Sequence, residues 1–136
     1  MALDEQQLSI LLQAGIEKAS ELLEHDGGFL PFGARAKPSG EIQFIQLGME
    51  EGETPGSLHR RLGEMLAAEA GRGELLGSAL VAETRISGEA DTPALAVLIE
   101  TIGFSRSVVV PYRAAAGKVD LGSMVPAEAE PVVFRN

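Results

Sequence analysis

Few side chains in this sequence have the chemistry of a catalytic or metal-binding group, and their spacing does not combine them. The chain has two histidines, His25 and His59, and no cysteine. A zinc site that joined them to a neighbouring carboxylate would lack the short histidine spacing of motifs such as HExxH. Ser39 and Ser123 lie outside any GxSxG motif, and two histidines leave few general bases for a serine nucleophile. We therefore predict no catalytic residue, no bound metal and no cofactor.

Three charged residues lie inside otherwise apolar segments and are the most informative polar positions. Glu83 and Arg85 share one face of a predicted strand, and Glu100 lies in the next strand. We expect Glu83 to pair with Arg85, and Glu100 to meet Arg85 or Arg106 across strands. The pattern fits either a polar patch in a face that binds a partner, or the solvated edge of a sheet.

Two segments of the chain have similar sequences, each centred on a proline followed by an aromatic residue. The run FLPFGA at 29–34 resembles VVPYRA at 109–114. If the two Pro-aromatic corners face each other, Pro31-Phe32 and Pro111-Tyr112 line one groove; otherwise they are two edge strands protected alike. The residues expected on an interaction surface are Phe32, Glu83, Arg85, Glu100, Val109 and Tyr112.

Two helices and several strands must position these residues. Asp4 and Gln7 form a capping-box pattern before an apolar stripe that ends at Gly27, and Thr54-Pro55 starts a second helix. The predicted helices cover 4–25 and about 54–70. Strands are expected at 29–36, 42–47, 75–86, 94–102, 106–113 and 118–121, with turn residues between them. The segment 122–136 reads as an irregular tail, in which residues 132–134 dock as a final short strand.

The order α-β-β-α-β-β-β predicts a single α+β domain over residues 1–136. We expect both helices to pack on one face of a five- or six-stranded, mainly antiparallel sheet. The segments 94–102 and 108–110 are apolar at successive positions, whereas a strand open to water on one side alternates. The second face must therefore be covered, either by a second subunit or by the C-terminal tail, and we predict a homodimer.

Composition limits the classes of partner. The chain of 136 residues carries 20 acidic and 11 basic residues, which gives a net charge of −9. Because no basic stripe is present, we expect neither nucleic acid nor a membrane surface as a partner. The N-terminal segment has no signal-peptide pattern and no apolar run reaches the length of a membrane span, so we predict a cytoplasmic protein.

The segment 25–44 (HDGGFLPFGARAKPSGEIQF), together with the later runs PALAVLIET and VVVPYRAAAGKV, resembles a group of small bacterial proteins of unassigned function. Those proteins also carry a Gly-Phe-x-Pro-Phe-Gly-Ala hairpin and a later Pro-Tyr strand, and the resemblance implies no catalytic residue. The element order is also similar to that of the roadblock and profilin-like dimeric scaffolds, which implies a scaffold rather than an activity.

Three functions follow as hypotheses. The first is a homodimeric, non-enzymatic module for protein interaction or regulation. The second is a small acidic inhibitor, such as an immunity protein, that covers a basic toxin with loop carboxylates. Those carboxylates would be Glu50, Glu51, Glu53, Glu89 and Asp91. The third is a ligand-binding protein or enzyme that uses the groove near Pro31 and Tyr112.

Overall fold

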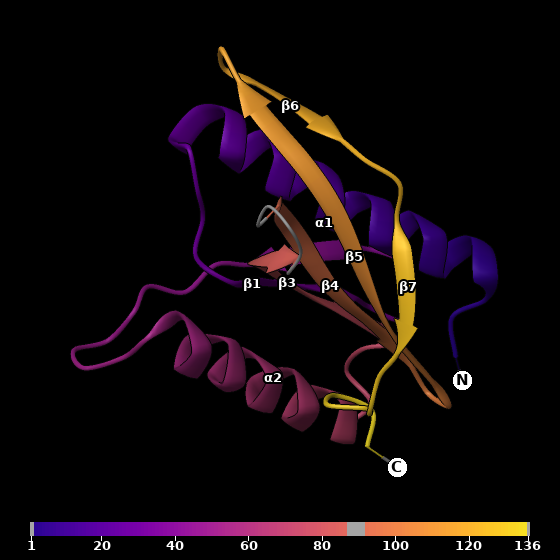
Figure 1. The fold of residues 1–136 in the computed structure, drawn as a ribbon. Helices are drawn as coiled ribbons and strands as arrows, with labels where there is room; N and C mark the ends of the chain where they lie inside the picture. Colours follow the sequence, from indigo (N-terminus) through magenta and orange to yellow (C-terminus); the bar gives the residue numbers. More distant parts are fainter. Residues whose placement is uncertain (1, 87–91, 136) are drawn as a thin grey trace.

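The computed structural model describes residues 2–86 and 92–135. Its elements follow the predicted order with one strand more. The helices are α1 (Glu5–Asp26) and α2 (Pro55–Gly71). The strands are β1 (Phe32–Ala36), β2 (Ile42–Ile45), β3 (Gly77–Ile86), β4 (Thr92–Thr101), β5 (Phe104–Ala115), β6 (Lys118–Leu121) and β7 (Val125–Glu128). The α+β class and the element order are confirmed (Figure 1).

Both helices begin at the residues that the sequence indicates. The Asp4 side chain accepts a hydrogen bond from the Gln7 backbone, and the Gln7 side chain accepts one from the Asp4 backbone. Gly27, with φ of 75°, closes α1 in the left-handed region that glycine adopts without strain. At α2, Thr54 is the N-cap and Pro55 follows it, where a missing N–H costs nothing.

One antiparallel sheet of seven strands forms the centre of the protein. Its order is β2-β1-β3-β4-β5-β6, and β7 pairs with β5 beside the end of β6. The pairs Tyr112–Leu121 and Val109–Val125 place two residues of β5 opposite three residues of the returning chain, which is a bulge at 122–124. The segment 122–136 is therefore not irregular throughout, because Val125–Glu128 continues the sheet.

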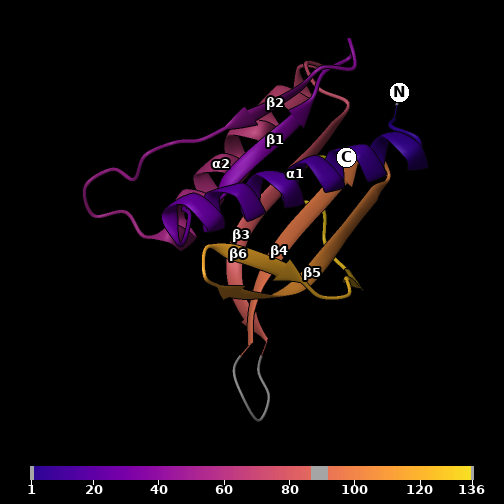
Figure 2. The ribbon, with the colours of Figure 1, turned by 90° about the horizontal axis from the view of Figure 1, so that it is seen from above.

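The two helices lie on opposite faces of this sheet, and the expectation that they share one face is wrong (Figures 1 and 2). In β3, Ala79 and Val81 pack in the core that α1 covers, whereas Leu80 packs in the core that α2 covers. The reason is topological. Strands β2 and β3 both pair with β1, so they run parallel to each other and α2 crosses β1 to connect them. Because such crossovers are nearly always right-handed, α2 has one preferred face.

Glycines let the helices approach the sheet closely. A Cβ at Gly15 of α1 would lie 3.2 Å from a methyl carbon of Val81. On the other face, a Cβ at Gly33 of β1 would lie 3.3 Å from a methyl carbon of Leu66. A larger side chain at either position would push a helix away from a core in which interior groups are closely packed.

The C-terminal tail covers part of the second face. Val133 and Phe134 are buried in the same core as Leu58, Leu62 and Leu80. They dock without forming a strand. The sequence predicted that either a second subunit or the C-terminal tail covers this face. Over this part of the sheet, the tail and α2 form the cover.

Candidate interaction surface

The six residues expected on an interaction surface do not share one surface. Phe32 and Glu100 are 1% and 0% exposed, so both lie inside the protein and out of reach of a partner in this fold. Glu83 and Tyr112 lie close together on the face of the sheet that α1 covers. Val109 points to the other face, because Val108 and Val110 belong to the core under α1.

Glu100 holds the C-terminal tail. Its carboxylate accepts hydrogen bonds from three consecutive backbone N–H groups, those of Val132 at 3.0 Å, Val133 at 3.0 Å and Phe134 at 3.3 Å. These three N–H groups replace the hydrogen bonds to water that the carboxylate loses on burial. The predicted pairing of Glu100 with Arg85 or Arg106 is wrong, and so is its place at a solvated edge, because β4 is central in the sheet.

The strands on both sides of Glu100 add polar groups to the space beneath the tail. Ser78 of β3 lies directly opposite Glu100 and is 0% exposed, and its hydroxyl has no hydrogen-bond partner among the described residues. Ser105 of β5 lies opposite on the other side and donates a hydrogen bond to the carbonyl of Ala129. The tail is thus attached to β4 and β5 by polar contacts beneath its apolar residues.

Glu83 connects three segments instead of pairing with Arg85. It accepts a hydrogen bond from the backbone of Phe29 at 3.1 Å and another from the Tyr112 hydroxyl at 3.2 Å. Burial of the ring, and then the negative charge of Glu83, raise the pKa of Tyr112 above its ordinary value. No ion pair forms between Glu83 and Arg85 in the described residues, so the expected pairing is wrong.

The groove expected between the two Pro-aromatic corners does not form. Phe32 lies in β1 and Tyr112 in β5, with β3 and β4 between them. Pro31 lines a pocket of about 170 Å³ beside Leu22, whereas Tyr112 lines a separate one of about 330 Å³ beside Leu121. The two similar sequence runs therefore serve two distant strands, and they do not build one site.

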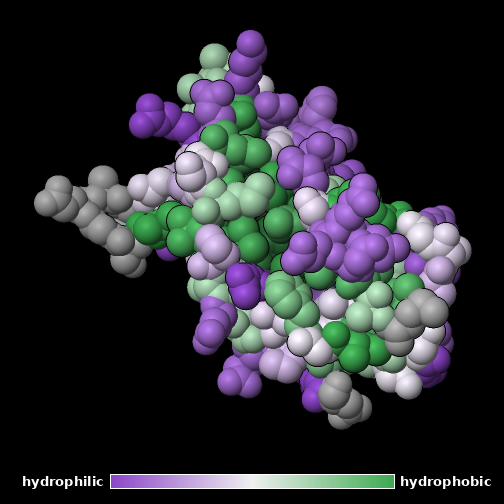
Figure 3. Space-filling view, turned by 90° about the vertical axis from the view of Figure 1, so that its right-hand side faces the viewer, coloured by the Kyte–Doolittle hydropathy of each residue, from purple (hydrophilic) through white to green (hydrophobic). Residues whose placement is uncertain are grey.

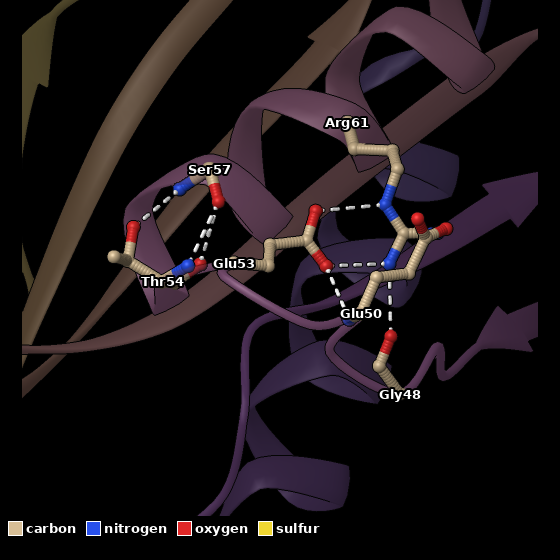
Figure 4. A network of polar contacts seen from close by, with 6 residues as sticks. All are labelled: Gly48, Glu50, Glu53, Thr54, Ser57 and Arg61. Atoms are coloured by element: carbon tan, nitrogen blue, oxygen red, sulfur yellow. Dashed lines mark hydrogen bonds and ion pairs between the residues drawn. The ribbon is translucent and has the colours of Figure 1, made fainter.

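The acidic loop before α2 is bound to the helix by one arginine (Figure 4). The guanidinium of Arg61 donates to both oxygens of Glu53, at 3.0 and 2.8 Å, and to the carbonyl of Gly48 at 2.8 Å. Glu50 lies 3.5 Å from the same guanidinium. The hydrogen bond from Arg61, followed by that from the Glu50 backbone, lowers the pKa of Glu53.

This ion pair bears on the hypothesis of an acidic surface that covers a toxin. Glu53 is already neutralised within the chain, and Glu50 is partly so. Glu51 is exposed. The other two carboxylates of that proposed surface, Glu89 and Asp91, lie outside the described residues.

A row of small apolar side chains crosses four strands on the face that α2 only partly covers. Ala82 of β3 lies opposite Ala96 of β4, Ala96 opposite Val109 of β5, and Val109 opposite Val125 of β7. Directly opposite residues point to the same face of a sheet. We call these four residues the valine row. Its first three members are half-buried, and Val125 is 55% exposed.

The rows on either side of the valine row are also free of charge. They consist of Thr84, Ala94 and Pro111 on one side, and of Leu80, Leu98, Ser107 and Ala127 on the other. Figure 3 views the molecule from the side that carries β7, and hydrophobic side chains extend there from the grey segment toward the middle. Hydrophilic side chains surround them.

Sequence reasoning found only Val109 of the valine row. Alanines at positions 82 and 96 carry little signal by themselves, and Val125 lies beside a proline in a segment that reads as irregular. The one signal for this row in the sequence is the run Val108–Val110. Three successive apolar residues in a strand place apolar side chains on both of its faces.

Neither the helices nor the comparisons with known proteins assign a class to the protein. Across the described ranges, neither helix combines the length and the apolar character needed to cross a membrane. Compared with known proteins, the chain matches no family model, no curated protein and no solved structure.

Proposed function

We propose that this protein is a non-enzymatic interaction module that forms a homodimer through the valine row. The observation that carries the proposal is the row itself. Each of four neighbouring strands contributes one uncharged side chain to it, and the row lies beside the part of the sheet that α2 and the tail cover. In a chain with a net charge of −9, an uncharged surface is where two copies approach with the least repulsion.

A symmetric pair suits this surface. In a two-fold interface the same patch contributes from both subunits, so the valine row of one copy would face that of the other. A stable interface buries about 800 Å² on each partner, which is more than four small side chains supply. We therefore expect the contact to extend to Ile86 and Met124, which are 36% and 45% exposed.

The proposal is tested by the mass of the protein in solution. At concentrations on the order of 10 μM, light scattering should give the mass of a dimer, and Val125→Asp should give that of a monomer. Ile10→Asp is the matched control, because Ile10 is 54% exposed on α1, on the other side of the sheet. A monomer at all concentrations would refute the proposal, as would equal loss of the dimer in both variants.

A further inference from the structure

A second surface feature lies on the face of the sheet opposite to the valine row. It is a groove of about 800 Å³ between the first half of α1 and the end of the sheet formed by β4 and β5. It exists because α1 lies over β3 and β4, which leaves the first residues of β5 uncovered on this face. Its volume falls in the range of sites that bind small molecules.

The floor of the groove is aliphatic. Ile99 and Val108 form its base, and Leu8 and Leu12 line the wall that belongs to α1. Phe104, which is 38% exposed, lies at the rim. A ligand that covered these side chains would displace water from apolar surface, which favours binding.

Two polar side chains of the lining already have partners within the chain. The carboxylate of Asp4 accepts from the Gln7 backbone. The hydroxyl of Thr101 accepts from the Leu3 backbone at 2.9 Å and donates to the carbonyl of Leu76 at 2.7 Å. These groups therefore have little capacity left to bind a ligand.

Arg106 is different. It is exposed, and its guanidinium lies 5.4 Å from the centre of the Phe104 ring, which holds the charge at the rim of the groove. Glu128 is its cross-strand neighbour, yet no carboxylate of the described residues lies within ion-pair distance of the guanidinium. A planar guanidinium without such a partner is suited to bind a carboxylate through two hydrogen bonds.

We propose that this groove binds a small aliphatic monocarboxylate, with its chain on Leu8, Leu12, Ile99 and Val108 and its carboxylate on Arg106. The acidic side chains on the α1 side, Asp4 and Glu5, orient the ligand, because they repel its carboxylate toward the strand that carries Arg106.

The test is titration of the ¹⁵N-labelled full chain with octanoate, followed by the shifts of backbone amide signals. We expect saturable shifts at the four residues under the aliphatic chain. Arg106→Gln should weaken binding by about tenfold or more, because it removes a charge-assisted pair. Arg113→Gln is the matched control, since Arg113 is an exposed arginine of the same strand on the other face.

Two further probes make the result decisive. Octyltrimethylammonium has the same chain length and the opposite charge, and it should bind far more weakly than octanoate. Ser9→Phe adds a large side chain at an exposed position of the α1 wall, and it should block octanoate while the fold is kept. Absence of saturable shifts, equal binding by Arg106→Gln, or equal binding of the ammonium probe would overturn the proposal.

The test does not depend on the homodimer. The valine row lies on the other face of the sheet, so Val125→Asp should bind octanoate as the unchanged chain does. A monomeric protein that binds octanoate would refute the proposed dimer and leave the groove as its binding site.

Discussion

The backbone N–H of Val133 lies 3.1 and 3.0 Å from the two carboxylate oxygens of Glu100. This bifurcated hydrogen bond joins the end of the chain to the centre of its sheet, and the amides of Val132 and Phe134 bind the same carboxylate. Glu100 therefore stabilises the tail that covers part of the second face.

Glu100→Gln tests this role with little change of shape. One carboxylate oxygen becomes an NH₂ group that faces backbone donors, so we expect the free energy of unfolding to fall by about 1–3 kcal/mol. Urea unfolding followed by circular dichroism measures it. Glu128→Gln, a change in an exposed residue of β7, should remain within about 0.5 kcal/mol of the unchanged chain. Equal stability of the two variants would contradict the role of Glu100.

The ion pair of Arg61 and Glu53 predicts a dependence of stability on pH. The pKa of Glu53 is below its ordinary value of 4.5, first because of the hydrogen bond from Arg61. A carboxyl group with a lowered pKa stabilises the fold above its unfolded pKa, and this stabilisation is lost as the pH falls through the folded pKa. Below about pH 4.5, the unchanged chain should therefore lose more stability than Arg61→Gln does.

Thermal unfolding between neutral pH and the acid range measures that difference. Arg60→Gln is the control, because Arg60 is exposed and makes no ion pair with the described carboxylates. It should follow the pH profile of the unchanged chain. The role assigned to Arg61 fails if Arg61→Gln also follows that profile.

Tyr112 reports on its neighbours through its own titration. The chain has one tyrosine and no tryptophan, so the ultraviolet absorbance of its phenolate belongs to Tyr112 alone. Burial raises its pKa first, the charge of Glu83 raises it further, and Arg85 lowers it. We expect Glu83→Gln to lower the pKa of Tyr112 and Arg85→Gln to raise it. A shift opposite to the expected sign in either variant would show that the charge removed there does not act directly on the hydroxyl.

The uncharged valine row predicts how the proposed dimer responds to salt. Two chains of charge −9 repel each other, and salt screens that repulsion, so association should be unchanged or stronger at about 0.5 M than at about 0.05 M salt. Sedimentation at both salt concentrations measures the dissociation constant. Weaker association at high salt would point instead to an interface in which opposite charges meet, and it would contradict an uncharged one.

The sequence by itself predicted the local structure well. The capping box of Asp4 and Gln7, the stop at Gly27 and the start at Thr54 are interactions between residues a few positions apart, and all three are confirmed. Strand positions were visible for the same reason, since apolar runs between turn residues depend on near neighbours. The apolar character of both faces of β4 and β5 predicted a cover on each face; α1 covers one face, and α2 with the tail covers part of the other.

Only the tertiary structure decided which groups meet. Glu100 appeared to need an arginine across the sheet, but it binds the tail 32 residues further along the chain. Phe32 and Tyr112 looked like two sides of a groove, but two strands separate them. The face on which α2 lies depends on the pairing of β1 with β3, which no local pattern reveals. The sequence shows which residues can form hydrogen bonds and which are hydrophobic, because these are properties of single residues. Which groups become their partners depends on the order of the strands, and that order results from the packing of the whole chain.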